Sequence, residues 1–405
     1  MKKLFVYVWA LLLFLPGATV IMTSLTDTSW DVQLKGYPAR LQRPELTADG
    51  LLAGEFQKSC SAWLEQQLPV RGRVIRSYAT LRYKLFDLGN SHPYRPVAKN
   101  HDLYDQGYID SELLINTARL SGNERLISLL DRADMSKAAN RREMEAFVGK
   151  LQLLQERLAR HNKYLYVYIT PNKADFHRGN IPEKYLRLAS PESVKPVDYF
   201  AELIKDTGIK YRICRDAAGE LEYPAFYTTG IHWSRTFEQR MSAAIIEDLT
   251  ALTGKPYQPV ILENARMSAR PFWRDADLYN LLNVWEEPDG QEYYEYDAGR
   301  PPEGEKFVPL RALMSGTSYG EGLLHDLHVV YPENNEVFMI NRDSFIMNTA
   351  DERTPFSKDF DWKGFDFAPY LSEADVVIIE STETELTGYS YGFVDALNNY
   401  LEGKP

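Results

Sequence analysis

The stretch "FVPLRALMSGTSYGEGLLHDLHVV", residues 307–330, joins an apolar run to an amphipathic one through a short turn rich in glycine and hydroxyl groups. Apolar runs bounded by turn residues are typical of buried strands, and the run after the turn has helical spacing. We therefore expect a strand, a tight turn and a helix, with Ser318 beyond the carboxyl end of the strand. Gly316 and Gly320 allow the sharp turn, and the start of the helix directs its N–H groups toward the serine.

Strand and helix patterns alternate outward from this stretch through residues 141–405. Strands that alternate with helices favour a mostly parallel sheet covered on both faces, so we expect an α/β, doubly wound fold. Further strands are predicted at "YLYVYIT" (164–170), "IKYRICR" (209–215), "EVFMINR" (336–342) and "ADVVIIEST" (374–382). Helices are predicted over residues 144–158, 235–253 and 390–402, and after residue 321.

Residues 27–140 are rich in polar and aromatic residues and carry two short helical patterns. The patterns are "EFQKSCSAWLEQQL" (55–68) and "RVIRSYATLRYKLF" (73–86). We expect a helical N-terminal region that leads from the membrane and packs on the domain of residues 141–405.

Residues 4–22 are uncharged and mostly apolar, and Lys2 and Lys3 precede them. This length is about enough to cross a hydrocarbon core, and the lysines should stay in the cytoplasm. We therefore expect residues 1–26 to form a single-pass anchor in the inner membrane, with the rest of the chain in the periplasm. The alternative is a signal peptide that is cleaved near "FLPGATV" (14–20), which would release a secreted protein.

The 405-residue chain has a net charge of -11, and we find no long basic run or RNA-binding signature, so a nucleic-acid partner is not expected. Cys60 and Cys214 are the only cysteines; they could form one disulfide or remain unpaired. We predict no metal site and no cofactor. An HxxH pair, His325 and His328, is interpreted as solvated or at the edge of the core rather than as metal ligands.

A serine hydroxyl needs a base before it acts as a nucleophile. Among the seven histidines, His232 lies in "FYTTGIHWS" (226–234), a stretch rich in turn residues just before a predicted helix. We expect the aromatic ring of Trp233 to pack beside this imidazole. A structural histidine at a helix start is the alternative interpretation.

Several blocks of the sequence together resemble a known family. "GTSYGEG" (316–322) looks like the serine block of SGNH hydrolases, and "TTGIHWS" (228–234) resembles the histidine block of the AlgX/AlgJ-type alginate O-acetyltransferases. In those proteins the SGNH hydrolase-like domain is circularly permuted, with the histidine before the serine. Further similar blocks are "LPVRGRVIRSYATLRYKLF" (68–86), "YVYITPNKADF" (166–176) and "ADVVIIESTETEL" (374–386). The resemblance spans most of residues 50–400.

This resemblance implies an exported, membrane-anchored enzyme that moves an acetyl group onto a hydroxyl of a polysaccharide. It also implies a membrane-bound O-acyltransferase partner that supplies the acetyl group. By matching position, Ser318 would be the nucleophile and His232 its base, with an oxyanion site shaped by the Ser318 N–H. The residues that we expect to bind substrate or shape this site are Lys173 at the P-x-K position, Trp233, Gly316, Thr317 and Tyr319.

One position departs from the family pattern, which is D-x-H-W, because Gly230 stands where the aspartate is expected. An acid elsewhere in the fold can replace it, and "RDADLYNLLNVW" (274–285) offers Asp277 and, as a second choice, Asp275. Asp277 is equally able to cap the helix that follows it. A backbone carbonyl or Thr228 could instead orient the ring in a Ser-His dyad, or the chain could have lost catalysis and bind only glycan.

Three functions remain open from the sequence. The favoured one is acetyl transfer through an acyl-serine to an exopolysaccharide hydroxyl. A carbohydrate acetylesterase would use the same residues and pass the acetyl group to water. A non-catalytic scaffold of a polysaccharide assembly complex would bind glycan through aromatic side chains such as those of "QEYYEYD" (291–297), which is otherwise a solvated loop.

Overall fold

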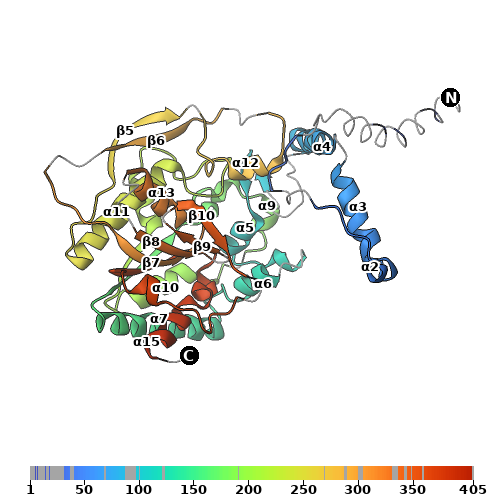
Figure 1. The fold of residues 1–405 in the computed structure, drawn as a ribbon. Helices are drawn as coiled ribbons and strands as arrows, with labels where there is room; N and C mark the ends of the chain where they lie inside the picture. The colour runs from blue at the N-terminus through green and yellow to red at the C-terminus, as the bar shows by residue number, and fades with distance from the viewer. Residues whose placement is uncertain are drawn as a thin grey trace. The chain divides into compact units, whose positions relative to one another are not determined.

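The computed structural model in Figure 1 consists of two compact units, which are Met1–Val97 with Leu278–Asp289, and Ala98–Asp277 with Gly290–Pro405. We call the first the helical unit and the second the sheet unit. The residues that the structure describes are 32–36, 41–67, 70–86, 97–99, 101–120, 124–189, 191–268, 270–286, 290–299, 304–330, 336–341, 344–347, 349–357, 360–403 and positions 5, 7, 14 and 18.

A seven-stranded sheet in the order β10-β9-β8-β7-β11-β3-β4 forms the centre of the sheet unit. Its five parallel strands are β3 (Tyr164–Thr170), β4 (Lys210–Ile213), β7 (Arg311–Gly316), β8 (Glu336–Asn341) and β11 (Val376–Thr382). The antiparallel strands β9 (Ser344–Met347) and β10 (Thr349–Pro355) complete one edge. The prediction of a mixed α/β fold with a mostly parallel sheet is confirmed, although the sequence patterns did not predict the edge pair.

Helices cover both faces of this sheet, because alternate residues of each strand point to opposite sides. Leu165, Val167 and Ile169 of β3 belong to one core, whereas Tyr166 and Tyr168 belong to the other. The helices on the first face are α7 (Ala138–Ala159), α10 (Pro196–Ile204), α14 (Ala368–Leu371) and α15 (Phe393–Leu401), and those on the second are α11 (Arg235–Thr253) and α13 (Glu321–Val330). Figure 1 shows α7, α10 and α15 on one side of the sheet and α11 and α13 on the other. The helices predicted from apolar spacing are therefore confirmed.

The sheet unit contains further short elements. These are β1 (Val97–Lys99) paired with β2 (Asp102–Tyr104), α5 (Gln106–Leu113), α6 (Glu124–Asp131), α8 (Lys173–Phe176), α9 (Glu183–Leu186), and a hairpin of β5 (Ile261–Ser268) and β6 (Tyr293–Gly299). The sheet unit begins at Ala98, whereas the catalytic domain predicted from the sequence begins at residue 141. Contacts near residue 102 explain the difference: Leu103 N–H donates to the Thr228 carbonyl over 2.8 Å, and Asp102 is ion-paired with Lys173.

The helical unit contains α2 (Ala48–Leu52), α3 (Glu55–Gln67), α4 (Arg71–Phe86) and most of α12 (Asp277–Leu282). The two helices predicted in this part of the chain correspond to α3 and α4. Within the unit, the Trp285 N–H donates to Thr80 Oγ1 over 3.0 Å, and Tyr83 packs edge-on against Tyr279 with centroids 5.9 Å apart.

No helix among the described residues is long and apolar enough to span a membrane. The anchor predicted over residues 4–22 lies outside the described residues except at positions 5, 7, 14 and 18. Cys60 and Cys214 are both free thiols, so they form no disulfide with each other.

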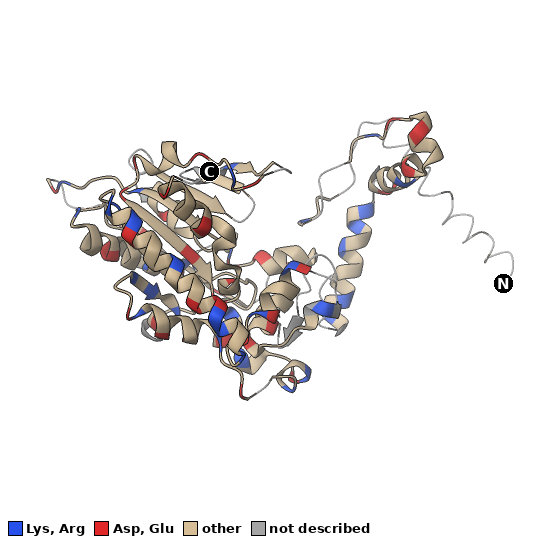
Figure 2. Cartoon of the chain, turned by 90° about the horizontal axis from the view of Figure 1, so that it is seen from below, with Lys and Arg blue, Asp and Glu red and all other residues tan. Residues whose placement is uncertain are grey.

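Basic and acidic residues are interspersed along the helices that Figure 2 presents. Several join neighbouring elements of the sheet unit: Lys150 of α7 pairs with Asp395 of α15 over 2.8 Å, and Arg212 of β4 pairs with Asp248 of α11 over 2.8 Å. The Lys150–Asp395 pair is about half exposed, and such pairs contribute little to stability, about 0–1 kcal/mol each. Burial of the apolar side chains in the two cores contributes far more.

Candidate active site

Ser318 lies in the turn between β7, which ends at Gly316, and α13, which begins at Glu321. The strand lies between two parallel neighbours, so the turn is at the carboxyl edge of the sheet, where ligands bind in folds of this class. Close packing explains why positions 316 and 320 are glycines. A Cβ on Gly320 would lie 2.4 Å from Met314 Cε, and one on Gly316 would lie 2.8 Å from Glu380 Oε2.

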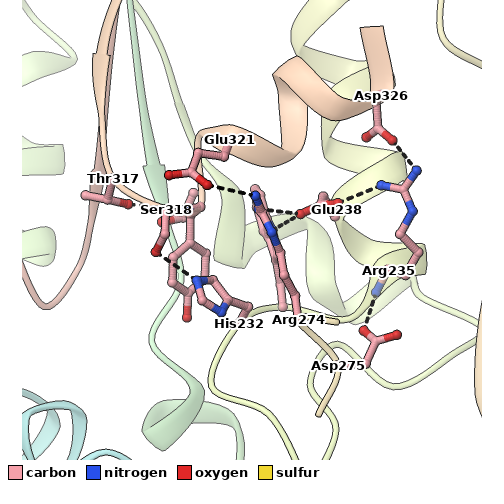
Figure 3. A network of polar contacts seen from close by, with 12 residues as sticks. His232, Arg235, Glu238, Arg274, Asp275, Thr317, Ser318, Glu321 and Asp326 are labelled. Carbon is pink, nitrogen blue, oxygen red and sulfur yellow. Dashed lines mark hydrogen bonds and ion pairs between the residues drawn. The ribbon is translucent and has the colours of Figure 1, made fainter. Parts of the chain in front are cut away.

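The structure brings Ser318, His232 and Asp277 together. His232 Nε2 lies 2.8 Å from Ser318 Oγ, and His232 Nδ1 lies 2.6 Å from Asp277 Oδ2; Figure 3 shows the serine and imidazole facing each other. The second oxygen of Asp277 accepts the Ile231 N–H over 2.8 Å. With a proton on Nδ1 held by the carboxylate, Nε2 is left to accept the serine proton, which is the arrangement of a serine triad.

Gly230 is packed against the backbone that carries this aspartate. A Cβ at position 230 would lie 2.6 Å from the Arg274 carbonyl oxygen and 2.7 Å from that of Asp275. No side chain fits there, so the carboxylate beside His232 comes from Asp277. The Asp275 carboxylate is directed elsewhere, since its Oδ1 accepts the Arg235 N–H over 3.0 Å.

Trp233 and Tyr319 lie inside the protein, although the sequence analysis assigned them to substrate binding. The Tyr319 ring packs on His232 with centroids 4.6 Å apart, and its hydroxyl donates to the Ile231 carbonyl over 2.6 Å. The Trp233 indole lies in the core and donates to Glu238 over 3.3 Å. Tyr319 therefore holds the imidazole in place, and Trp233 packs against Tyr319 with centroids 5.7 Å apart. Both residues are buried and offer no surface to a ligand.

Lys173 is also enclosed rather than exposed in a pocket. Its ammonium is 2.9 Å from Asp102 Oδ1 and donates to the carbonyl oxygens of Leu103 (2.7 Å), Tyr227 (2.8 Å) and Gly230 (2.6 Å). Burial lowers the pKa of Lys173, and the Asp102 carboxylate opposes that effect. Lys173 thus fastens the backbone that leads to His232, and a substrate does not reach it in this structure.

Glu380 lies directly beneath the turn that carries Ser318, and no pattern in the sequence marks it as a site residue. It comes from β11, is fully buried, and accepts the Thr317 N–H together with the hydroxyls of Thr317 and Thr170, both over 3.1 Å. Burial raises the pKa of Glu380 to about 7, although these hydrogen bonds oppose it. Because the Thr317 amide is already bonded inside the protein, the expected oxyanion site depends on the Ser318 amide.

A buried network of charges supports the segment that carries Asp277. Arg274 contacts Glu238 of α11 over 3.0 Å and Glu321 of α13 over 3.4 Å, and Arg235 contacts Glu238 over 2.6 Å and Asp326 over 2.5 Å (Figure 3). These pairs tie the segment to the helix after His232 and to the helix after Ser318. Sequence patterns could not reveal the network, because its members come from three separate segments.

Trp273 is an exposed aromatic residue beside the reacting pair. Its side chain is 51% exposed, and its ring centroid is 6.0 Å from that of His232. The Arg274 guanidinium lies 4.7 Å from the centroid of the Trp273 ring. No spacing or motif in the sequence identifies this residue, because its position depends on how the segment before Asp277 folds back on the loop that carries His232.

Among the described residues, no group of three metal-ligating side chains is close enough to hold an ion. The HxxH residues follow the interpretation made from the sequence: His328 is exposed, and His325 packs on Phe272 with centroids 5.1 Å apart. Burial, helped by the positive charges of Arg235 and Arg274, lowers the pKa of His325 to about 4.

Comparison with known proteins finds no matching family model and no matching curated protein. Similar solved structures include the O-acetyltransferase domain of Pseudomonas putida AlgJ, with 15% identity over 67% of this chain and 95% of that chain (TM-score 0.39). Pseudomonas aeruginosa AlgX is 12% identical over 75% of this chain and 67% of its own (TM-score 0.42), and Bacillus cereus PatB1 is 11% identical over 62% and 93% (TM-score 0.37). AlgJ and AlgX, which the sequence blocks resemble, are thus among these structures. At such TM-scores the likeness assigns no function, which has to come from the site itself.

Proposed function

We propose that this chain is an O-acyltransferase that carries an acetyl group on Ser318 and passes it to a hydroxyl of an exopolysaccharide. The observation that supports this most is the hydrogen-bonded series from Asp277 through His232 to Ser318, at 2.6 Å and 2.8 Å. The series accounts for acyl chemistry on a serine. The acetyl group and the polysaccharide acceptor are suggested by the sequence blocks that resemble alginate O-acetyltransferases.

In the first step Ser318 Oγ attacks the carbonyl carbon of an acetyl ester while His232 Nε2 takes the hydroxyl proton. Negative charge develops on the carbonyl oxygen, which the Ser318 N–H and the positive end of α13 would stabilise. When the intermediate collapses, the bond to the donor oxygen breaks and His232 returns the proton to that oxygen. The donor alcohol leaves, and an acetyl ester remains on Ser318.

In the second step the same imidazole takes a proton from a sugar hydroxyl, whose oxygen attacks the acetyl carbonyl. Ser318 Oγ is the leaving group and recovers its proton from His232. Asp277 stabilises the imidazolium that forms in both steps and keeps the ring in the productive tautomer. An acetylesterase would differ only in using water in place of the sugar.

We also propose the wider setting that the sequence implies. The domain would act in the periplasm from an inner-membrane anchor, and a membrane-bound O-acyltransferase partner would supply the acetyl group. The apolar, lysine-preceded segment at residues 4–22 supports the anchor.

Acetylation of the purified protein tests the proposal. Incubation with 4-nitrophenyl acetate should place one acetyl group on Ser318, detected by intact mass and peptide mapping, and Ser318→Ala should abolish it. His232→Ala should slow its formation by about 10³-fold or more. Ser315→Ala, a change in the neighbouring strand residue, is the matched control and should acetylate normally. Acetylation that persists in Ser318→Ala, or its absence from the wild type, would contradict the proposal.

A further inference from the structure

Trp273 is notable for its position rather than for its exposure alone, since single exposed hydrophobic residues are common. Its ring is 6.0 Å from the imidazole that would remove the acceptor's proton, and about half of the side chain is open to solvent, at 51%. A molecule that covers this ring is therefore next to the reacting atoms.

The ring is held in place before any ligand arrives. The Arg274 guanidinium packs 4.7 Å from its centroid, and that arginine is itself only 2% exposed and is fixed by the carboxylates of Glu238 and Glu321. Phe272 lies beside Trp273 with centroids 6.1 Å apart. A surface that is already ordered loses little conformational entropy when it binds, which favours affinity.

The same short segment carries Trp273 and Asp277, so the exposed ring and the carboxylate that supports His232 are placed by one piece of backbone. We infer that the Trp273 ring is the platform on which a pyranose ring of the acceptor stacks, adjacent to the hydroxyl that receives the acetyl group. This inference rests on the proposed function.

The chemistry of the platform fits the uncharged face of a sugar. Arg274 lies against the indole, but it is buried and its charge is balanced by Glu238 and Glu321, so it presents no free cation to a ligand. Tryptophan combines a large apolar face with a rigid shape, and a pyranose presents a face of C–H groups that packs on such a surface. Carbon atoms in van der Waals contact are about 3.5–4 Å apart, so a sugar packed on the indole stays beside His232.

Stacking on Trp273 would affect which acceptor takes the acetyl group from the acetyl-enzyme. A stacked sugar holds its hydroxyl near the acetyl carbonyl, whereas water and small alcohols reach it only by diffusion. Trp273 therefore determines how strongly a glycan hydroxyl competes with water for the acetyl group.

The test measures how the acetyl groups of the acetyl-enzyme are distributed among competing acceptors. Wild type and variants are acetylated with 4-nitrophenyl acetate, and the acetyl-enzyme of each is measured separately so that transfer is expressed per acetylated protein. The acceptors are methanol, methyl β-glucopyranoside, cellohexaose, chitohexaose and a mannuronate hexamer. The variants are Trp273→Ala, Trp273→Phe and Tyr164→Ala, whose aromatic side chain is 38% exposed at the amino end of β3 and thus at the opposite edge of the sheet.

We expect the wild type to prefer at least one of the sugars over methanol, and Trp273→Ala to lose that preference by about tenfold or more, as the loss of an aromatic stacking partner implies. Trp273→Phe should keep most of the preference, and Tyr164→Ala should keep all of it. The inference is overturned if the wild type does not prefer a sugar over methanol, or if Trp273→Ala keeps the preference. It is also overturned if Trp273→Ala only slows acetylation, since the ring then contacts the donor. Absence of an acetyl-enzyme in the wild type would instead overturn the proposed function.

Discussion

Two aspartate–histidine pairs in the sheet unit have nearly the same geometry and different surroundings. Asp277 Oδ2 lies 2.6 Å from His232 Nδ1, and Asp102 Oδ2 lies 2.7 Å from His177 Nδ1. The Nε2 atom of His232 also lies 2.8 Å from Ser318 Oγ. The second imidazole borders the Phe226 ring at 6.5 Å between centroids, and in the part of the chain that the structure describes it has no hydrogen bond to a serine.

The second carboxylate is fully buried and serves several groups at once. Tyr104 donates to it over 2.8 Å and Asn180 over 3.0 Å, and the Lys173 ammonium lies 2.9 Å away. Burial alone would raise the pKa of Asp102, but the bond with His177 and the charge of Lys173 outweigh it and hold the pKa at about 2. A carboxylate beside an imidazole is thus not by itself a sign of catalysis; the third partner of the imidazole decides what the pair does.

Catalytic activity should distinguish the two aspartate–histidine pairs. Asp277→Asn should lower the rate of acetyl-enzyme formation by about 10³–10⁴-fold, because an amide favours the wrong tautomer of His232 and cannot stabilise the imidazolium. His177→Gln should leave the rate within about tenfold of the wild type, since the Nδ1 of this ring bonds to Asp102 and not to a member of the triad. Stopped-flow release of 4-nitrophenolate measures both.

Unfolding in urea provides the control for that pair of variants. Asp277→Asn should keep a midpoint close to that of the wild type, since Oδ1 of an asparagine still accepts the Ile231 N–H. An Asp277→Asn protein that is stable and acetylates at the wild-type rate would show that the carboxylate has no catalytic part, and the site would then be a Ser-His dyad.

A smaller effect is expected on stability at the second pair. Lys173→Met removes a buried charge that balances Asp102 and that contacts four carbonyl oxygens, so it should reduce the free energy of unfolding by about 3–5 kcal/mol. Adding Asp102→Asn should recover part of the loss, because no buried charge is then left without a partner. A loss below about 1 kcal/mol in urea unfolding would mean that the pair is not essential to the fold.

The sequence predicted the parallel strands and the main helices well, because their patterns are local. "YLYVYIT" coincides with β3, and the helix predicted over residues 235–253 coincides with α11. The edge strand β10 was missed because "TADERTP" contains three charges and a proline in seven residues, which is untypical of a strand. The alternation in β5 is also weak, since every residue of "ILENARMS" is partly or fully exposed.

The site was predictable only where a motif marks it. Ser318 follows a strand and precedes a helix, and His232 lies in a recognisable block, so both could be proposed from the chain. Asp277 could be proposed only as one of several candidates, because its pairing depends on how residues 272–277 fold back. The locations of Lys173 and Glu380 could not be foreseen, because a buried charge is recognised only once its partners from other segments are known.

Glu380 is another buried carboxylate, and it accepts hydrogen bonds from neutral donors. Its partners are the Thr317 amide and the hydroxyls of Thr317 and Thr170, whereas Asp102 has an ammonium and Asp277 an imidazole. Burial without a paired cation explains why the pKa of Glu380 is raised from 4.5 to about 7. An acid with a raised pKa in the folded state costs stability once it ionises.

The sign of the pH dependence follows from this shift. Below pH 4.5 the side chain is protonated in both the folded and the unfolded protein and has no effect, but between 4.5 and about 7 only the unfolded state loses the proton. Wild-type stability should therefore fall by about 3 kcal/mol through this range on account of Glu380. Glutamine cannot ionise and still accepts the Thr317 N–H, so the free energy of unfolding of Glu380→Gln should not fall for this reason.

Urea unfolding of Glu380→Gln and wild type across this pH range measures the difference between them, which cancels the contributions of the other buried carboxylates. The free energy of unfolding of the variant should gain about 3 kcal/mol on that of the wild type between pH 4.5 and pH 8. Glu156→Gln, on the exposed face of α7, is the matched control and should give a nearly constant difference. A constant difference for Glu380→Gln as well would mean that water or an unrecognised donor stabilises the ionised carboxylate. A charged carboxylate would then lie beneath the turn that carries Ser318. The charged Asp102 supports the loop that carries His232 in a similar way, through Lys173.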